Sequence, residues 1–367
     1  MRKGWEYKRW KEVLTIINGK NQSAVVDANG EYPIYGSGGI MGYANNWLCP
    51  ENCVIIGRKG NINKPIFVET KFWNVDTAFG LNANIEYLLP KFLFYFCLDY
   101  NFERHNKAVT IPSLTKADLL KIDIPLPPKS TQLAIVSELD KINELIRLKK
   151  EQLKDFDNLA QSLFYEMFGD PVENEKGWEV KKLGEIGEVK TGNTPSRSND
   201  NFYNEKFIEW IKTDNIRNEQ MNPTTAAEYL SRDGAECGRI VSKGSVLVAC
   251  IAGSLSSIGK CCITTKNVAF NQQINAITPY GDFCNSIYLY ELIRNSYKYI
   301  QQNATTGMKH ILSKSIFEKM KFPLPPLSLQ RLFAQRIEQI EREKSEIQKS
   351  IQDLETLLAS RMQYWFE

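Results

Sequence analysis

The sequence predicts an α+β protein in which two tandem globular domains are joined by two long antiparallel helices that form a coiled coil, in a pseudo-twofold circular arrangement. Three observations support this class. The string at residues 3–9 (KGWEYKR) returns at 176–182 (KGWEVKK), an offset of 173 residues. The string at 124–128 (IPLPP) returns at 322–326 (FPLPP), an offset of 198. A glutamine and a long heptad pattern follow each proline-rich string, so one plan occurs twice with middles of unequal length.

The two long helices are predicted after Gln132 and Gln330, where apolar residues recur at alternating steps of four and three. This spacing is typical of a coiled-coil seam. Lys149 and Lys344 interrupt the two patterns at equivalent places. The alternative is that each helix packs only on its own domain, but residues 132–167 would span about 54 Å as a helix. The predicted seam residues are Ile135, Leu139, Ile142, Ile146, Leu153, Phe156, Leu163, Phe333, Ile337, Ile340, Ile347, Ile351, Leu354 and Leu358.

The chain is predicted to divide into four segments. Residues 1–128 form the first globular domain, 129–170 the central helix, 171–327 the second globular domain and 328–367 the C-terminal helix. Gly169 and Pro171 end the central helix. Within the globular segments, strands are expected at 53–56, 65–68, 246–249 and 275–278, and shorter helices at 87–98 and 286–299.

Composition favours an ordinary globular protein, with 43% hydrophobic and 24% charged residues among 367. No apolar run reaches the length of a membrane span, and the first residues lack a signal peptide, so we expect a cytoplasmic protein without membrane contact. The eight cysteines and two histidines do not have zinc-site spacing, so we predict no metal site and buried, reduced thiols.

Catalytic motifs are not found. Both Pro-Pro pairs follow leucine, whereas amino-group methyltransferases need Asn/Asp-Pro-Pro-Tyr/Phe. Gly259-Lys260-Cys261 and Gly19-Lys20-Asn21 do not satisfy a P-loop, and there is no HExxH string. The sequence therefore predicts no catalytic residue.

DNA binding is better supported than catalysis. Residues 1–128 and 171–327 each carry a net charge of +3, a small excess that permits nucleic-acid binding without demonstrating it. A basic, glycine-flanked loop at 57–64 is paired with 253–260, and such loops can bring backbone amides close to phosphates. Segments 191–197 and 210–217 are rich in side chains that can read base edges, although Trp210 and Ile211 fit core positions. Surface turns and structural caps, as for Asp76-Thr77 and residues 271–273, are the alternative. The candidate DNA-binding residues are Tyr35, Ser37, Arg58, Lys59, Asn61, Lys64, Thr194, Ser196, Arg197, Lys212, Asn215, Arg217, Ser254, Ser256, Lys260, Gln272 and Gln273.

Taken together, these motifs resemble one family over essentially the full length: the specificity subunits of type I restriction–modification systems. The resemblance depends on the repeated Gly-Trp, on TGNTP at 191–195, and on each Pro-Leu-Pro-Pro string with its glutamine and helix. The first domain departs from this pattern. It lacks TGNTP and has residues 32–38 (YPIYGSG) instead, so its base readers cannot be transferred from the second domain.

The resemblance implies two target-recognition domains, each reading half of a split, non-palindromic double-stranded DNA site, with the helices as a ruler. It implies two modification subunits that carry S-adenosylmethionine, and restriction subunits that use ATP and Mg²⁺. This chain would have no cofactor and no catalytic activity of its own. The alternatives are a relative that keeps the scaffold without reading DNA, as a decoy would, or an independent methyltransferase.

Overall fold

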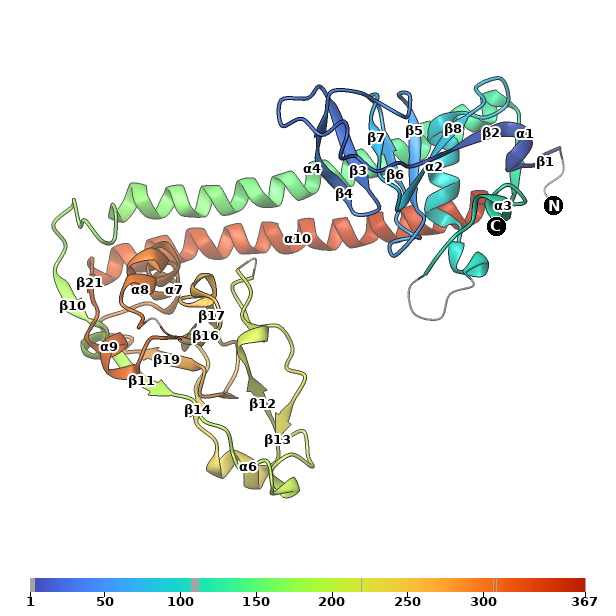
Figure 1. Cartoon of the computed structure of the whole chain (residues 1–367). Coiled ribbons are helices and arrows are strands. Elements are labelled where there is room, and N and C mark those ends of the chain that lie inside the picture. The colour runs from blue at the N-terminus through green and yellow to red at the C-terminus, as the bar shows by residue number, and fades with distance from the viewer. Residues whose placement is uncertain (1–3, 107–111, 219, 306, 308, 367) are drawn as a thin grey trace. The chain divides into compact units, whose positions relative to one another are not determined.

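The computed structural model describes residues 4–106, 112–218, 220–305, 307 and 309–366, so Lys3 of the first repeated string lies outside the described residues. The chain forms two compact units. Unit 1 comprises residues 1–151 and 348–367, and unit 2 comprises residues 152–347. Each unit therefore combines one globular part with part of each long helix, α4 (Lys129–Phe168) and α10 (Leu327–Phe366) (Figure 1).

Unit 1 contains a four-stranded antiparallel sheet in the order β2-β8-β5-β6, a three-stranded sheet in the order β4-β3-β7, and the ribbon β1-β9. Its elements are β1 (Glu6–Arg9), α1 (Trp10–Val13), β2 (Leu14–Asn18), β3 (Tyr32–Gly36), β4 (Gly39–Ala44), β5 (Cys53–Gly57), β6 (Ile66–Val68), β7 (Trp73–Asn74), β8 (Ala78–Ala83), α2 (Pro90–Asp99), η1 (Phe102–His105), α3 (Lys116–Leu119) and β9 (Asp123–Leu126).

Unit 2 repeats the main sheet in the order β11-β19-β15-β17 and the ribbon as β10-β21. Its second sheet has the order β13-β12-β18-β14, in which the parallel pair β12-β18 matches the parallel pair β3-β7 of unit 1, and the pair β16-β20 is additional. Its elements are β10 (Val180–Lys182), α5 (Leu183–Ile186), β11 (Gly187–Thr191), η2 (Asp200–Phe202), β12 (Ile208–Ile211), η3 (Thr213–Asn215), β13 (Tyr229–Leu230), α6 (Arg232–Cys237), β14 (Ile240–Val241), β15 (Val246–Ala249), β16 (Ile251–Ala252), η4 (Leu255–Ser257), β17 (Cys261–Ile263), β18 (Val268–Phe270), β19 (Ile274–Pro279), α7 (Ser286–Asn295), α8 (Tyr297–Gln302), β20 (His310–Ile311), α9 (Lys314–Lys319) and β21 (Lys321–Pro323).

The strand registers show which residues of the two units correspond. In unit 1, Leu14 pairs with Ala83 and Val54 pairs with Leu81. In unit 2, the equivalent pairs are Gly187 with Pro279 and Val246 with Ile277. The offset is therefore 173 at β2, 192 at β5 and 196 at β8. Of the 25 additional residues in unit 2, 19 lie between the first strand of the main sheet and β15. Most of the unequal length that the sequence shows between the repeated strings therefore lies between β2 and β5 of the first unit and their counterparts in the second.

The two repeated strings are neighbours in space. Lys8 of the first string pairs with Ile124 of the proline-rich string, and Lys181 pairs with Phe322 in the same antiparallel manner. Each ribbon thus brings the start of a globular part to the point where its chain enters a long helix.

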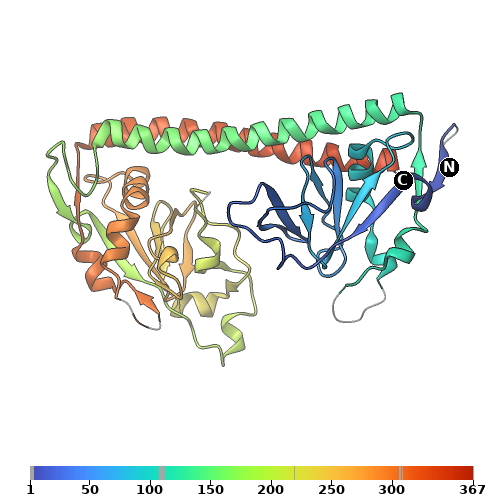
Figure 2. The same cartoon turned by 45° about the horizontal axis from the view of Figure 1, so that its top comes forward.

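In each unit, a separate hydrophobic core attaches the long helices to the main sheet. In unit 2 the rings of Phe168 and Tyr288 lie 4.9 Å apart, and Phe168 also packs on Phe333 of α10. In unit 1 the corresponding pair is Phe366 and Phe92, at 5.3 Å. Figure 2 shows α7 and α8 of unit 2 between the sheet and the long helices.

The long helices run antiparallel within each unit. In unit 1, Lys150 Nζ lies 2.8 Å from Glu355 Oε1, and the earlier Glu138 binds the later Arg361. In unit 2, Lys344 Nζ lies 3.0 Å from Asp157 Oδ1. Of the fourteen seam residues, nine are buried, and five (Leu153, Phe156, Leu163, Leu354 and Leu358) are half-buried. The predicted tandem domains with long antiparallel helices are confirmed.

Candidate nucleic-acid interface

Several candidate DNA-binding segments meet at one end of each main sheet. In unit 1 the carbonyl oxygen of Thr77 accepts hydrogen bonds from the backbone amides of Arg58 and Lys59. In unit 2 the carbonyl oxygen of Gln273 accepts from Cys250 and Ile251 in the same way. The loop after β5 or β15 therefore lies against the turn before β8 or β19, and the turn at Asp76-Thr77 is equivalent to the turn that ends at Gln273.

These bonds correct the alignment of the two basic loops. The sequence pairs Gly57 with Gly253, but the structural counterpart of Gly57 is Ala249. Each residue of β15 stands 192 positions after the equivalent residue of β5. The loop in unit 2 is four residues longer, and the registers coincide again at Ile66 and Cys262. Lys64 thus corresponds to Lys260, whereas Arg58 and Lys59 correspond to Cys250 and Ile251.

The counterpart of the TGNTP string is also different from the one expected. Gly192 donates its amide to Ile274 O and Asn193 to Phe270 O; Gly19 donates to Ala78 O and Lys20 to Asn74 O. Asn18-Gly19-Lys20 therefore occupies the place of residues 191–193. A Cβ at Gly192 would lie 2.2 Å from Asn271 O, and one at Gly19 would lie 1.8 Å from Val75 O, so both positions require glycine. Tyr32–Gly36 corresponds instead to β12.

The basic loop of unit 1 exposes four of its candidates. Arg58, Lys59, Asn61 and Lys64 are exposed, and the Arg58 guanidinium lies 5.8 Å from the centre of the Phe79 ring. This loop can therefore offer three cations to a phosphate backbone.

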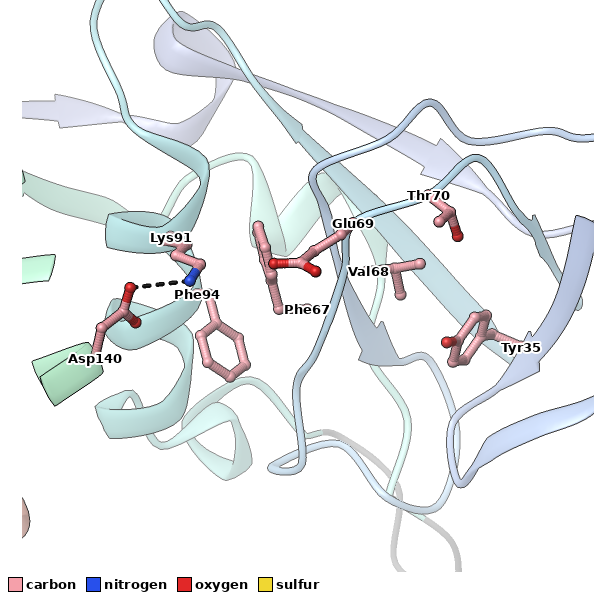
Figure 3. Close-up of a pocket in the computed structure, with 8 residues that line it drawn as sticks. All are labelled: Tyr35, Phe67, Val68, Glu69, Thr70, Lys91, Phe94 and Asp140. Carbon is pink, nitrogen blue, oxygen red and sulfur yellow. Dashed lines mark hydrogen bonds and ion pairs between the residues drawn. The ribbon is translucent and has the colours of Figure 1, made fainter. Parts of the chain in front are cut away.

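Tyr35 and Ser37 lie on or beside β3 and are half-buried. Tyr35 lines a cavity of about 410 Å³ with Glu69, Lys91 and Asp140 (Figure 3). Lys91 Nζ lies 2.9 Å from Asp140 Oδ2, so the cation there is already paired. The charge at this cavity does not favour a phosphate.

In unit 2, Arg197 and Lys212 lie together around Glu228. Arg197 Nη2 donates a hydrogen bond to Glu228 Oε2, and Lys212 Nζ donates one to Glu228 Oε1. The Arg197 guanidinium also lies 4.5 Å from the centre of the Tyr203 ring and 4.8 Å from that of Trp210. Burial raises the pKa of the Glu228 carboxyl, but the hydrogen bonds from Lys212 and Arg197 prevail and lower it.

A second group of candidates in unit 2 lines a cavity of about 480 Å³. Arg217, Lys260 and Gln273 meet there with Asp214 and Ser257. Gln273 also accepts a hydrogen bond from Asn271 Nδ2 at 3.1 Å. The structure thus brings together residues 56 positions apart in the sequence, with two cations and one carboxylate.

The remaining candidates are small polar residues and one buried amide. Thr194 Oγ1 bonds Gln272 Oε1, and Ser254 Oγ lies 3.0 Å from Ser256 Oγ; all four are exposed, as is Ser196. Asn215 is only 9% exposed, its Oδ1 accepts from Lys212 N, and its Nδ2 donates to Thr224 and Thr225. We therefore assign Asn215 to the structure of its turn and not to base contact.

Glu228 was missed by the sequence reading, because a lone glutamate carries no recognisable pattern. Its place follows from pairing: Trp210 N donates to Glu228 O at 3.1 Å, beside the pair β12–β13. Trp210, read as a core strand residue, is indeed 3% exposed, but one face of its ring also supports Arg197.

Comparison with known proteins decides the family. Residues 2–155 and 175–356 match the family described as the type I restriction modification DNA specificity domain. The chain belongs to this family. The type I restriction enzyme HindI specificity subunit of Haemophilus influenzae is 24% identical over 74% of both chains. The MjaVIII specificity subunit of Methanocaldococcus jannaschii is 22% identical over 96% of this chain and 92% of its own.

Two solved structures share the fold of this specificity subunit. The S subunit from M. genitalium has a TM-score of 0.63 at 15% identity and covers 99% of this chain and 96% of its own. A chain from a structure of type I restriction–modification complex assembly has a TM-score of 0.61 at 19% identity, covering 99% and 97%.

The specificity subunit is thus a non-catalytic DNA-recognition protein of a restriction–modification complex. Among the described residues there is no group of three or more histidine, cysteine or acidic side chains placed to hold a metal ion. Within the same residues, none of the helices has the length and apolar character that crossing a bilayer demands.

Proposed function

We propose that this subunit reads a bipartite, asymmetric DNA site, with residues 1–128 contacting one half and residues 171–327 the other. The observation that carries the proposal is that equivalent loops on one scaffold present different side chains. Arg58 and Lys59 in the first unit stand where Cys250 and Ile251 stand in the second. Two copies of one scaffold with different reading side chains suit a target whose halves differ.

The segments 129–170 and 328–367 would then set the distance between the halves. Helices α4 and α10 have 40 residues each, about 60 Å at the usual rise. Major-groove half-sites one turn apart are separated by about 34–36 Å. Domains attached along such helices can reach successive major grooves and leave central base pairs unread.

Partner subunits would supply the chemistry. We expect two modification subunits, which bind S-adenosylmethionine, and restriction subunits, which use ATP and Mg²⁺. The chain has two equivalent junctions, which supports two modification subunits for each specificity subunit. Gln132 and Gln330 make the same hydrogen bonds where each long helix begins.

Methylation mapping tests the proposed target. The chain is produced with its modification partner, and genomic DNA is sequenced for methylated bases. We expect a split, non-palindromic site with several unspecified central base pairs. A continuous or palindromic site would contradict the proposal.

Binding measurements with the same complex separate phosphate contacts from base contacts. We expect Arg58→Ala and Lys212→Ala to weaken binding to the mapped duplex, and Lys154→Ala, which removes an exposed cation from α4, to have a smaller effect. Equal loss for all sequences marks a phosphate contact, and relaxed sequence choice marks base readout. If the complex binds all duplexes alike, the scaffold or decoy alternative is correct.

A further inference from the structure

The segment that carries Arg197 is held by the same two aromatic residues that face its guanidinium. Tyr203 Oη donates to Pro195 O at 2.6 Å, and Trp210 Nε1 donates to Asn193 O at 3.3 Å. Arg197 follows these two anchored residues and lies in a turn that is closed by a hydrogen bond from Asn199 N to Ser196 O, at 3.3 Å. The backbone on the N-terminal side of Arg197 and its planar group are therefore fixed against one pair of rings.

One edge of the guanidinium is fixed as well. Arg197 Nη2 lies 2.5 Å from Glu228 Oε2, while the Arg197 side chain remains 52% exposed. A guanidinium has five N–H donors in a rigid fork. With Cζ close to both rings and Nη2 on the carboxylate, the guanidinium is held on two sides, and about half of the side chain remains accessible to a ligand.

Charge also permits an anion or an electronegative edge to approach. Glu228 binds two cations, because Lys212 Nζ pairs with its other oxygen and lies 4.9 Å from the centre of the Trp210 ring. The three side chains together carry a charge of +1. Without Lys212, the pair of Arg197 and Glu228 would be neutral and would attract DNA less.

We propose that Glu228 is a positioning residue that holds Arg197 in the orientation needed to read a guanine in the half-site of the second domain. This inference rests on the proposed function. Arginine paired with the O6 and N7 atoms of guanine is the commonest specific major-groove contact, and it requires a fixed planar geometry.

A phosphate is the weaker assignment for Arg197. Phosphate contacts can be made by mobile lysines and arginines and carry no sequence information. A carboxylate beside the cation lowers its attraction to phosphate, whereas a base edge is neutral and gains from the fixed orientation. The combination of two aromatic contacts and a carboxylate contact therefore points to a base.

The test uses the complex with its modification partner and the target found by methylation mapping. Affinities are measured for the mapped duplex, for duplexes with single base-pair changes in the second half-site, and for an unrelated duplex. For wild type, we expect replacement of one G·C pair to reduce affinity at least roughly tenfold. Arg197→Lys, which keeps the charge but loses the fork, should abolish that preference and leave the other positions unchanged.

Glu228→Gln should reduce the preference at the same base pair several-fold, while binding to the unrelated duplex increases because a negative charge is lost. Glu228→Asp, which keeps the charge, should retain part of the preference. Glu205→Gln is the matched control: Glu205 also forms an ion pair with one arginine, Arg232, at 3.8 Å. It should raise unspecific binding without changing base preference.

Two results would overturn the inference. Glu228→Gln could strengthen binding to all duplexes with base preference unchanged, which would make Glu228 a competitor of DNA. Arg197→Lys could leave base preference unchanged and weaken binding to all sequences alike, which would make Arg197 a phosphate contact. A wild-type complex without any sequence preference is a separate result, because it would reject the proposed function itself.

Discussion

Gln132 and Gln330 are buried glutamines that join three segments at the start of each long helix. Gln132 Oε1 accepts from Leu89 N at 2.9 Å, and its Nε2 donates to Tyr87 O and Pro127 O. Gln330 makes the same three bonds to Asn285, Phe283 and Pro325. Both side chains have no exposed surface, so the end of each proline-rich strand, the short helix before it and the long helix are tied together.

We therefore predict that Gln330→Ala destabilises the protein by about 3 kcal/mol, because it leaves one buried donor and two buried acceptors without partners. Gln330→Glu should cost at least as much, since it replaces the donor by an acceptor facing two carbonyl oxygens. Denaturant unfolding measures both variants. Gln348→Ala, at an exposed position of α10, should change the free energy of unfolding by less than about 0.5 kcal/mol. Similar effects for Gln330 and Gln348 would reject the structural role.

The eight cysteines differ sharply in accessibility. All are free, and only Cys237 is exposed. Burial raises the pKa of the Cys53, Cys250, Cys262 and Cys284 thiols to about 12. Because the thiolate is the reactive form, the buried thiols are doubly protected.

We expect an aromatic disulfide reagent to modify one thiol in the native protein and eight after denaturation. Cys237→Ser should reduce the native count to zero, and Cys53→Ser should leave it at one. A native count of three or more would show that the buried sites open readily.

At the scale of residues, the sequence identifies charged and polar side chains but not the contacts that they make. Arg197 and Lys212 were recognisable as polar candidates near a strand. Their pairing with Glu228 was not, because it depends on a strand partner 16 to 31 positions away. Asn215 has the composition of a base reader, yet its amide is used by its own turn.

At the scale of elements, the two units attach their short helix to the long helices with different chemistry. In unit 1, Tyr95 Oη donates to Asp140 Oδ1 at 2.6 Å. In unit 2 the equivalent position is Glu291, 2% exposed, which lies 3.4 Å from Arg294; Arg294 in turn binds Asp157 of α4. The pKa of Glu291 is raised by burial and by Glu341, against the opposing effects of Arg294 and Lys344.

This shift predicts the pH dependence of a substitution. A carboxyl whose pKa is higher in the folded state binds more protons when folded, so its contribution to stability falls as the pH rises above its ordinary value of 4.5. Glu291→Gln removes that loss. The unfolding free energy of the variant relative to wild type should therefore increase between about pH 4.5 and pH 7, measured by urea unfolding. Glu346→Gln, exposed on α10, controls for the lost charge. A difference that is constant or falls with pH would contradict the prediction.

The elements also show why the repeat was visible at its ends and not in its middle. The repeated strings form the ribbons β1–β9 and β10–β21, whose side chains and prolines recur at constant offsets. Between them the offset changes from 173 to 192 and then to 196. Equivalent strands between the repeated strings make the same backbone hydrogen bonds, and these bonds do not depend on which side chains the residues carry. The pairing of Gly57 with Gly253 was wrong for this reason.

At the scale of the whole molecule, the C-terminal residues belong to the unit that is distant in sequence. Residues 348–367 are part of unit 1, although they follow unit 2 along the chain. Phe366 packs on Phe92, and Trp365 stacks on Trp5 with ring centres 6.4 Å apart. Glu138 accepts hydrogen bonds from Arg361 and from Trp365 Nε1. The N-terminal domain therefore depends on the last residues of the chain for part of its core.

We predict that a chain ending after Ile347 loses stability in unit 1 and not in unit 2. Hydrogen–deuterium exchange should rise in β5 and α2, because α2 loses the Phe366 contact and Glu138 loses its partners, while exchange in β15 and α7 stays unchanged. In the full-length chain, Phe366→Ala should produce a smaller rise in the same unit 1 segments, and Ser360→Ala, at an exposed position, should produce none. Equal changes in both units, or a rise confined to unit 2, would contradict the assignment. The predicted circular arrangement already returns the final helix toward the first domain, but the side chains that make the first domain depend on it appear only when the contacts of that helix are known.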